Sequence, residues 1–259
     1  MTSWITRPKR DIVKDEAVIC AIALHEERYI DEWIQYHLKL GFYHIYIYDN
    51  SDTYVLKNRK SEYVTVIHYP GKTKQLEVYR LFVINYKRKF KWAAFIDIDE
   101  FIVLKKHARI MDLLHDYPDC EALVLNWIIF GTSNELTYRD EPVTKRFQKC
   151  SLQVHYQFKS ICQLQQIRNF ENPHMPILPP HHTIIDSNRT IITSHENLNG
   201  PTDIACIHHY YTKSEQEFRE KIERGRADIV EKRSMTELHN IHNKNNDVEN
   251  QDAWIFYNS

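Results

Sequence analysis

Apolar runs alternate with amphipathic segments through the first half of the chain. Continuous apolar, β-branched or aromatic runs predict buried strands at 17–24, 43–48, 63–68, 92–96 and 122–129. Between them, apolar residues at helical spacing predict helices over 29–40, 73–90 and 110–117. Strands that alternate with helices predict an α/β domain with a mostly parallel central sheet flanked by helices. In such sheets, ligands bind beyond the carboxyl ends of the strands. We therefore expect one edge to carry the loops 25–28, 49–52, 70–75, 97–100 and 130–134.

Two carboxylates, Asp97 and Asp99, follow the apolar run that begins at Trp92. We expect the strand to continue through Ile98, so that both side chains project the same way. Like charges held side by side repel and lose hydration, and a hard divalent cation offsets both effects. Many isolated Asp-x-Asp sequences lie on solvated turns, but the preceding apolar run favours a strand. The pattern predicts a Mn²⁺ or Mg²⁺ site that also binds a diphosphate.

The second half of the chain is less regular. Short apolar pieces predict strands at 154–158, 183–185, 190–193 and 204–207. The proline-rich segment 172–182 cannot be a helix, whereas the charged segment 215–230 has helical periodicity. We expect a polar N-terminal arm at 1–15, a single domain at 16–230 and a polar tail at 231–259. That tail is either disordered or docks through its aromatic end, 254–257, and we favour partial docking.

A second polar cluster follows the apolar run 204–207. His209 lies at a predicted strand end, where an imidazole nitrogen can complete a carboxylate–metal site. Lys213, Lys221 and Arg224 could neutralise a diphosphate. The alternative is a His-Tyr pair at an interface, followed by a solvated basic helix.

Composition excludes several classes of function. The 259 residues carry a net charge of −1 with pI about 6.9, so no overall positive charge attracts the chain to nucleic acid. We find no signal peptide and no apolar run of membrane-spanning length, and we expect a cytoplasmic protein without a transmembrane segment. The five cysteines form no Cys-x-x-Cys pair, and no Gly-x-Ser-x-Gly motif is present. Only five glycines occur and none forms a phosphate-binding loop, so a phosphate would need a metal and cationic side chains.

An ordered set of motifs from about residue 17 to 228 resembles glycosyltransferase family 92, whose members have the GT-A fold. The motifs are His25-Glu26 with Tyr29-Ile30-Asp31-Glu32-Trp33, Tyr48-Asp49-Asn50-Ser51, Gln75, Lys91-Trp92, Phe95-Ile96-Asp97-Ile98-Asp99-Glu100-Phe101, Asn126-Trp127 with Phe130-Gly131, and His209-Tyr210-Tyr211-Thr212-Lys213-Ser214 with Phe218, Lys221 and Arg224-Gly225. The sequence departs from the family where Leu24-His25-Glu26 replaces the usual Lys-Asn-Glu. Contacts to the donor base are expected to differ there.

The resemblance implies a Rossmann-like, GT-A domain that binds a nucleotide-sugar donor, usually a UDP-sugar, and a glycan acceptor. Residues 16–130 would bind the donor, and the less regular part, 131–230, would bind the acceptor. The implied metal ligands for Mn²⁺ (or Mg²⁺) are Asp97, Asp99 and His209. The expected donor-binding residues are Glu26, Asp49, Asn50, Gln75, Asp97, Lys213, Lys221 and Arg224, and Trp127, Phe130 and Gly131 match the segment beside the sugar and acceptor.

The expected reaction is a metal-dependent transfer of a hexose-type sugar to a hydroxyl of a glycan or glycoconjugate, with inversion because characterised relatives mostly invert. Such a transfer needs a base, and Glu135, Asp140 and Glu171 are the candidates. Two alternatives stay open at this stage. One is a metal-dependent nucleotidyl- or phosphotransferase, and the other is a non-catalytic glycan- or partner-binding module on a decayed transferase fold.

Overall fold

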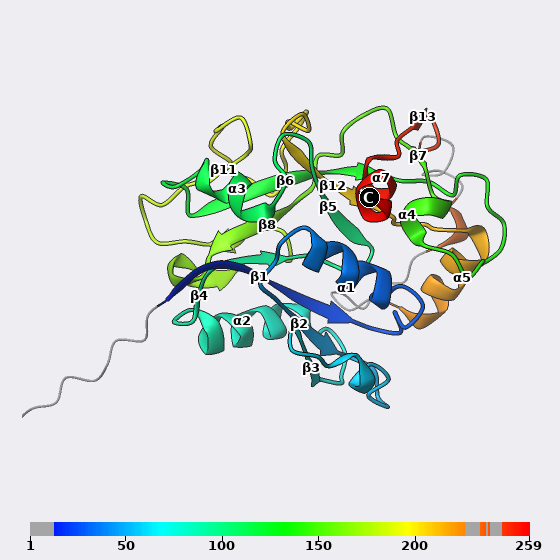
Figure 1. The fold of residues 1–259 in the computed structure, drawn as a ribbon, viewed down its shortest axis with the longest axis horizontal. Coiled ribbons are helices and arrows are strands. Elements are labelled where there is room, and N and C mark those ends of the chain that lie inside the picture. The colour runs from blue at the N-terminus through cyan, green and yellow to red at the C-terminus, as the bar shows by residue number, and fades with distance from the viewer. Residues whose placement is uncertain (1–12, 226–233, 237, 239–244) are drawn as a thin grey trace, which may run out of the picture.

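The protein, seen in a computed structural model, is built on a nine-stranded mixed sheet (Figure 1). The structure describes residues 13–225, 234–236, 238 and 245–259. The sheet contains β1 (Lys14–Ala23), β2 (His44–Asp49), β3 (Val64–His68), β4 (Phe90–Phe95), β5 (Glu100–Leu104), β6 (Ala122–Ile129), β8 (Phe158–Gln163), β11 (Ile184–Ile185) and β12 (Ala205–His209). The helices are α1 (Ile30–Lys39), α2 (Gln75–Tyr86), α3 (Ile110–His115), α4 (Val143–Arg146), α5 (Glu215–Arg224) and α7 (Asp252–Asn258).

The sheet brings most strand ends to one edge. Its order is β3-β2-β1-β4-β8-β6-β12-β5, with β11 beside β6. Strands β1 to β4 are parallel, and β6 and β12 run the same way because β8 is antiparallel to both β4 and β6. The carboxyl ends of β1 to β4, β6 and β12 therefore meet at one edge, which confirms the predicted mostly parallel α/β sheet.

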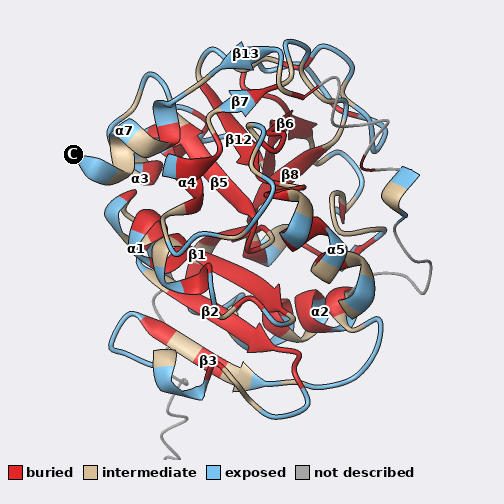
Figure 2. Cartoon of the chain, turned by 90° about the vertical axis from the view of Figure 1, so that its right-hand side faces the viewer, coloured by how far each residue is buried: buried red, intermediate tan, exposed pale blue. Residues whose placement is uncertain are grey.

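Helices cover both faces of this sheet because the buried strands are apolar on both sides. Along β1, Ala17, Ile19 and Ala21 belong to the cluster that packs against α1 and α3. Val18 and Cys20 point to the other face, where α2 packs. Figure 2 shows the buried residues concentrated in the strands and the exposed ones on loops and outer helix surfaces. Two small ribbons complete the fold, β7 (Lys149–Cys150) with β13 (Val248–Glu249) and β9 (Asn169–Phe170) with β10 (Pro176–Ile177).

The prediction that the strand continues through Ile98 is wrong. Strand β4 ends at Phe95, and a turn closed by a hydrogen bond from Glu100 N to Asp97 O (3.1 Å) leads into β5. Ile98 is nevertheless buried, because the turn lies under neighbouring segments and not in solvent. Asp97 and Asp99 thus owe their positions to a turn and not to strand alternation.

Other boundaries also shift. Strand β1 begins at Lys14, inside the predicted arm, because Lys14 N donates to Lys89 O (2.9 Å) beside β4. The strand predicted at 154–158 begins only at Phe158, and the piece at 190–193 forms a single bridge between Ile191 and Ile185. Residues 1–12 of the arm and 226–230 of the predicted helix lie outside the described residues, as do 231–233, 237 and 239–244 of the tail.

The aromatic C-terminal segment docks on the domain, as expected. It forms α7, which lies beside α4 in Figure 1. The rings of Phe256 and Tyr257 lie 5.0 and 6.5 Å from the ring of Tyr36 on α1. Within the part of the chain that the structure describes, no helix combines the length and the apolar character needed to cross a bilayer.

Candidate functional site

A lysine from the centre of the sheet neutralises the first aspartate of the turn. Asp97 accepts a hydrogen bond from Gln75 Nε2 (2.7 Å) on one carboxylate oxygen and pairs with Lys159 Nζ (2.8 Å) through the other. Lys159, on β8, has a side chain that is only 1% exposed, and its ammonium also lies 3.8 Å from Glu100 Oε1. Although burial favours the neutral amine, Asp97 and Glu100 raise the pKa of Lys159 above its ordinary value. The turn is therefore held by a buried cation.

The second aspartate of the turn, Asp99, contacts residues of α5 and β12. Asp99 Oδ2 pairs with Lys221 Nζ (2.6 Å) on α5, and its Oδ1 lies 3.5 Å from His209 Nε2 at the end of β12. Burial alone would raise the pKa of Asp99, but Lys221 and His209 lower it well below its ordinary value. Burial lowers the pKa of His209, which leaves its imidazole neutral at neutral pH. Asp99 is thus a fixed negative charge between an ammonium and an imidazole.

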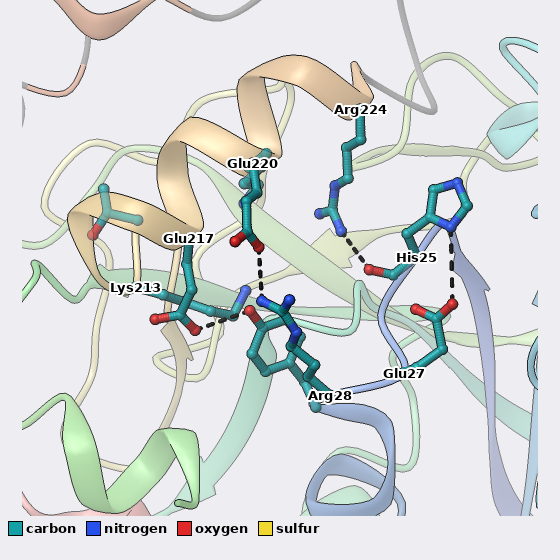
Figure 3. Close-up of a pocket in the computed structure, with 10 residues that line it drawn as sticks. His25, Glu27, Arg28, Lys213, Glu217, Glu220 and Arg224 are labelled. Carbon is teal, nitrogen blue, oxygen red and sulfur yellow. Dashed lines mark hydrogen bonds and ion pairs between the residues drawn. The ribbon is translucent and has the colours of Figure 1, made fainter. Parts of the chain in front are cut away.

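A pocket of about 310 Å³ opens beside Lys221 (Figure 3). It is lined by His25, Glu27, Arg28, Tyr29, Thr212, Lys213, Glu217, Glu220, Lys221 and Arg224. One wall is the loop between β1 and α1, and the other is the segment from the end of β12 through α5, so residues distant in sequence face each other across it. Arg28 pairs with Glu220 (2.7 Å), and Arg224 pairs with Glu26 (2.5 Å) at the end of β1. Four basic side chains line this pocket.

One of the four, Lys213, has no acidic partner in the part of the chain that the structure describes. Lys213 is only 3% exposed, and no carboxylate of the described residues lies within 4 Å of its ammonium. Its ammonium lies over the ring of Tyr29, 4.3 Å from the centroid, which is a cation–π contact. Its backbone has φ +55°, a left-handed conformation that strains a residue with a side chain. His25, across the pocket, has φ +53°. Strain of this kind clusters at functional sites.

A buried ion pair supports the wall behind Lys213. Glu217 pairs with Arg146 (2.6 Å), and both side chains are almost inaccessible to solvent. Glu217 also accepts a hydrogen bond from Tyr29 OH (2.9 Å) and caps α5 through Ser214. Burial disfavours the charge of Glu217, but the hydrogen bonds from Arg146 and Ser214 lower its pKa overall. The tyrosine under Lys213 is thereby locked in place.

Two predicted donor-binding residues, Asp49 and Asn50, form hydrogen bonds with backbone groups of neighbouring loops. Asp49 is fully buried and accepts hydrogen bonds from Ser51 N (3.0 Å) and Leu56 N (2.8 Å). Asn50 Nδ2 donates to the carbonyl oxygens of Tyr69 and Gly71, both at 2.8 Å. These contacts shape the edge of the sheet, and direct donor binding by either residue stays a prediction.

The predicted acceptor residues separate into two environments. The Trp127 ring lies beside the His209 imidazole, with centroids 4.3 Å apart. Phe130 is completely buried and packs on His208 and not on the Asp97–Asp99 turn. Gly131 is a point of close approach, since a Cβ there would come within 2.5 Å of Asn246 Oδ1. Of the three, Trp127 therefore contacts a neighbour of the Asp97–Asp99 turn, because its ring packs on His209, which faces Asp99.

The three predicted base candidates form contacts elsewhere. Glu135 pairs with Arg139, and Asp140 accepts a hydrogen bond from Tyr138 OH (3.2 Å). Glu171 is exposed in the connection between β9 and β10. Among the described contacts, none joins these carboxylates to Asp97 or Asp99.

Two of the three predicted metal ligands, Asp99 and His209, have donor atoms that face each other. Asp99 Oδ1 and His209 Nε2 face each other 3.5 Å apart, and a carboxylate with a neutral imidazole is a donor set that Mn²⁺ accepts. Both oxygens of Asp97 are engaged by Gln75 and Lys159. Within residues 13–225, 234–236, 238 and 245–259, no group of three His, Cys, Asp or Glu side chains lies close enough to hold a metal. The full set of Asp97, Asp99 and His209 stays a prediction.

Comparison with known proteins identifies the family. The sequence profile of glycosyltransferase family 92 matches residues 15–246. The chain belongs to glycosyltransferase family 92. The turn, the pocket and the buried lysines described above all lie within the matched residues.

Curated relatives are family 92 proteins of plants. One from Oryza sativa subsp. japonica is 28% identical over 152 residues, which cover 55% of this chain and 26% of that protein. One from Ricinus communis is 30% identical over 129 residues, covering 48% of this chain and 22% of that protein. One from Arabidopsis thaliana is 26% identical over 107 residues, covering 39% and 19%. The match thus spans about a quarter or less of each relative's length.

Two residues of this family 92 site, Lys159 and Arg28, were not predicted from the sequence. Lys159 lies one residue beyond the strand predicted at 154–158, although a lysine within the run Phe158–Gln163 is a signal of a buried charge. Arg28 was missed because nothing in its local sequence indicates that it faces α5. The partners of both lie far along the chain.

Proposed function

We propose that this chain transfers a sugar from a nucleotide-sugar, a UDP-sugar, to a hydroxyl of a glycan or glycoconjugate acceptor. Membership of family 92 supports glycosyl transfer. The observation that carries the donor site is Lys213, a buried cation without a carboxylate partner among the residues that the structure describes, in a pocket with three further basic side chains. A buried unpaired charge is costly, and an anionic ligand offsets that cost. The donor's diphosphate is such a ligand.

The same residues suit the charge that develops during transfer. As the bond between the anomeric carbon and the diphosphate breaks, negative charge grows on the leaving oxygen, and fixed cations stabilise it. Lys213 binds this charge directly, and Lys221 and Arg224 extend the positive wall along α5. Asp99 and His209 would hold a Mn²⁺ or Mg²⁺ ion, which supplies further neutralisation of the diphosphate when bound. Lys159 keeps Asp97 in place beneath the site.

The acceptor is expected beside Trp127. Attack by its hydroxyl from the side opposite the leaving diphosphate inverts the anomeric centre. Nucleoside diphosphate is then the second product, whereas a nucleotidyltransferase acting on the same donor pocket would release pyrophosphate. The identity of the released product separates these two reactions.

Calorimetric titration tests the donor site. We would titrate UDP, GDP, UDP-glucose, UDP-galactose and GDP-sugars into the wild type and Asp99→Asn, with and without Mn²⁺. Asp203→Asn is the matched control, because Asp203 is exposed and pairs with Lys106 on the surface. We expect Mn²⁺-dependent binding of one nucleotide that Asp99→Asn loses and Asp203→Asn keeps. No binding, or binding indifferent to both metal and Asp99, would favour a non-catalytic module instead.

A further inference from the structure

Three histidines surround the indole of Trp127. The ring centroids of His209, His174 and His155 lie 4.3, 5.1 and 5.6 Å from that of Trp127. His209 belongs to the site described above. His155 precedes β8, and His174 lies in the connection between β9 and β10, so the fold brings two further imidazoles to the side expected to receive the acceptor.

Backbone contacts fix the proton of His174 on one nitrogen. Its Nδ1 lies 2.8 Å from the carbonyl oxygen of Phe158, which can only accept a hydrogen bond. Nδ1 must therefore carry the proton, and Nε2 of the neutral ring keeps a lone pair. Burial lowers the pKa of His174 to about 4, and the positive charge of Lys159 adds to this effect. The ring is thus neutral at neutral pH.

The loop around His174 is unusually well held. Asn172 Oδ1 accepts hydrogen bonds from the backbone N of His174 (2.8 Å) and of Met175 (3.0 Å). Ser160 Oγ donates to the carbonyl oxygen of His174 at 2.5 Å. In the described part of the chain, Nε2 forms no hydrogen bond, so its lone pair is uncommitted. Both backbone and ring are oriented before any ligand arrives.

The neighbouring His155 has the opposite tautomer. Its Nδ1 accepts a hydrogen bond from the backbone N of Gln157 (3.2 Å), so the proton of the neutral ring is on Nε2. Burial lowers the pKa of His155 to about 4 as well. His155 therefore presents a donor, whereas His174 presents an acceptor beside the same indole.

We propose that His174 is the general base of the transfer, an inference that rests on the proposed function. The acceptor hydroxyl gives its proton to His174 Nε2 while its oxygen forms a bond to the anomeric carbon. The bond from that carbon to the diphosphate breaks, and its electron pair leaves with the nucleoside diphosphate. The negative charge of Asp97 favours the resulting imidazolium. The imidazolium then returns its proton to water. His174 takes the role that the sequence analysis offered to Glu135, Asp140 and Glu171.

The variant His174→Asn isolates this role. An asparagine amide can still donate to the Phe158 carbonyl in place of Nδ1, but it has no base at the position of Nε2. His115→Asn is the matched control, since His115 is an exposed residue of α3. The assay follows nucleoside diphosphate release from UDP-sugars and GDP-sugars, with p-nitrophenyl glycosides of common monosaccharides or water as acceptor. Calorimetry gives the Kd for the nucleotide.

We expect His174→Asn to lower kcat by about 10²- to 10⁴-fold, the usual contribution of a general base, with the nucleotide Kd within about twofold. A kcat within about threefold of an active wild type would overturn this inference and leave the proposed function intact. A loss of kcat that is matched by a loss of nucleotide binding would also overturn the inference that His174 is the general base. A wild type that releases no nucleoside diphosphate with any of these acceptors would overturn the proposed function and this inference together.

A spectroscopic measurement tests the tautomer independently of activity. Nitrogen-15 NMR of imidazole-labelled protein, assigned with His174→Asn, should show His174 at neutral pH with a protonated Nδ1 and an unprotonated Nε2. The reverse pattern would remove the lone pair from the acceptor side and overturn the proposal.

Discussion

Replacing Lys213 by methionine removes a buried ammonium while keeping an unbranched side chain of similar length. Lys213 lines the pocket without a carboxylate partner among the described residues, whereas Lys221 in the same pocket pairs with Asp99 at 2.6 Å. The two lysines therefore differ in what their removal leaves behind. Lys213→Met and Lys221→Met form a matched pair that separates ligand binding from stability.

The expected loss of affinity follows from a single contact. A hydrogen bond between a charged donor and an anionic oxygen contributes about 1.5–3 kcal/mol. Because about 1.4 kcal/mol corresponds to a tenfold change in Kd, Lys213→Met should raise the Kd for the nucleotide by about 10- to 150-fold. Lys221→Met should weaken binding as well, since its ammonium lines the same pocket.

The expected stabilities diverge. Lys213→Met leaves no carboxylate of the described residues unpaired and removes a charge from a site that is 3% exposed. Its free energy of unfolding should therefore be unchanged or higher. Lys221→Met leaves the carboxylate of Asp99 buried without its ammonium partner, and breaking a buried pair in this way costs about 3–5 kcal/mol.

Calorimetric titration with UDP in the presence of Mn²⁺ and urea unfolding of the free protein measure the two quantities. If the Lys213 ammonium binds the diphosphate, Lys213→Met loses affinity for UDP without losing stability. A Kd within twofold of the wild type would show that Lys213 does not bind the diphosphate. A destabilisation equal to that of Lys221→Met would show that the Lys213 ammonium is needed to hold the fold.

Two further predictions concern the free protein. Glu217→Gln should lower the free energy of unfolding by about 3–5 kcal/mol, because it leaves the buried guanidinium of Arg146 unpaired. Glu220→Gln, which removes one partner of an exposed ion pair, should lower it by less than about 1 kcal/mol. Equal effects of the two variants in urea unfolding would contradict this prediction. Burial lowers the pKa of His37 and of His208 to about 3, against about 6.5 in the unfolded chain, so the unfolded state binds more protons between these values. The free energy of unfolding should therefore fall as the pH drops from about 6.5 toward 3, by up to about 1.4 kcal/mol per pH unit for each histidine. A constant free energy of unfolding in urea at pH 7.5, 6 and 5 would refute this prediction.

The sequence by itself determined the framework. Strand β6 was predicted at its observed bounds, 122–129, because an apolar run long enough to cross a sheet reports burial directly. The alternation of strands and helices predicted a parallel sheet, and a parallel sheet brings loops distant in sequence to one edge. Gln75 and Asp97 meet there as that reasoning expects.

Only the tertiary structure decided which charges are paired. Lys213 and Lys221 look alike in sequence, yet one pairs with Asp99 and the other faces a pocket without a carboxylate partner among the described residues. Lys159 neutralises Asp97 from 62 residues away, and His174 owes its free lone pair to the Phe158 carbonyl. Local sequence reports whether a segment is buried, because burial depends on its own side chains. Pairing depends on distances of a few ångströms between segments, and those exist only once the sheet, the turn at Asp97 and helix α5 have packed together.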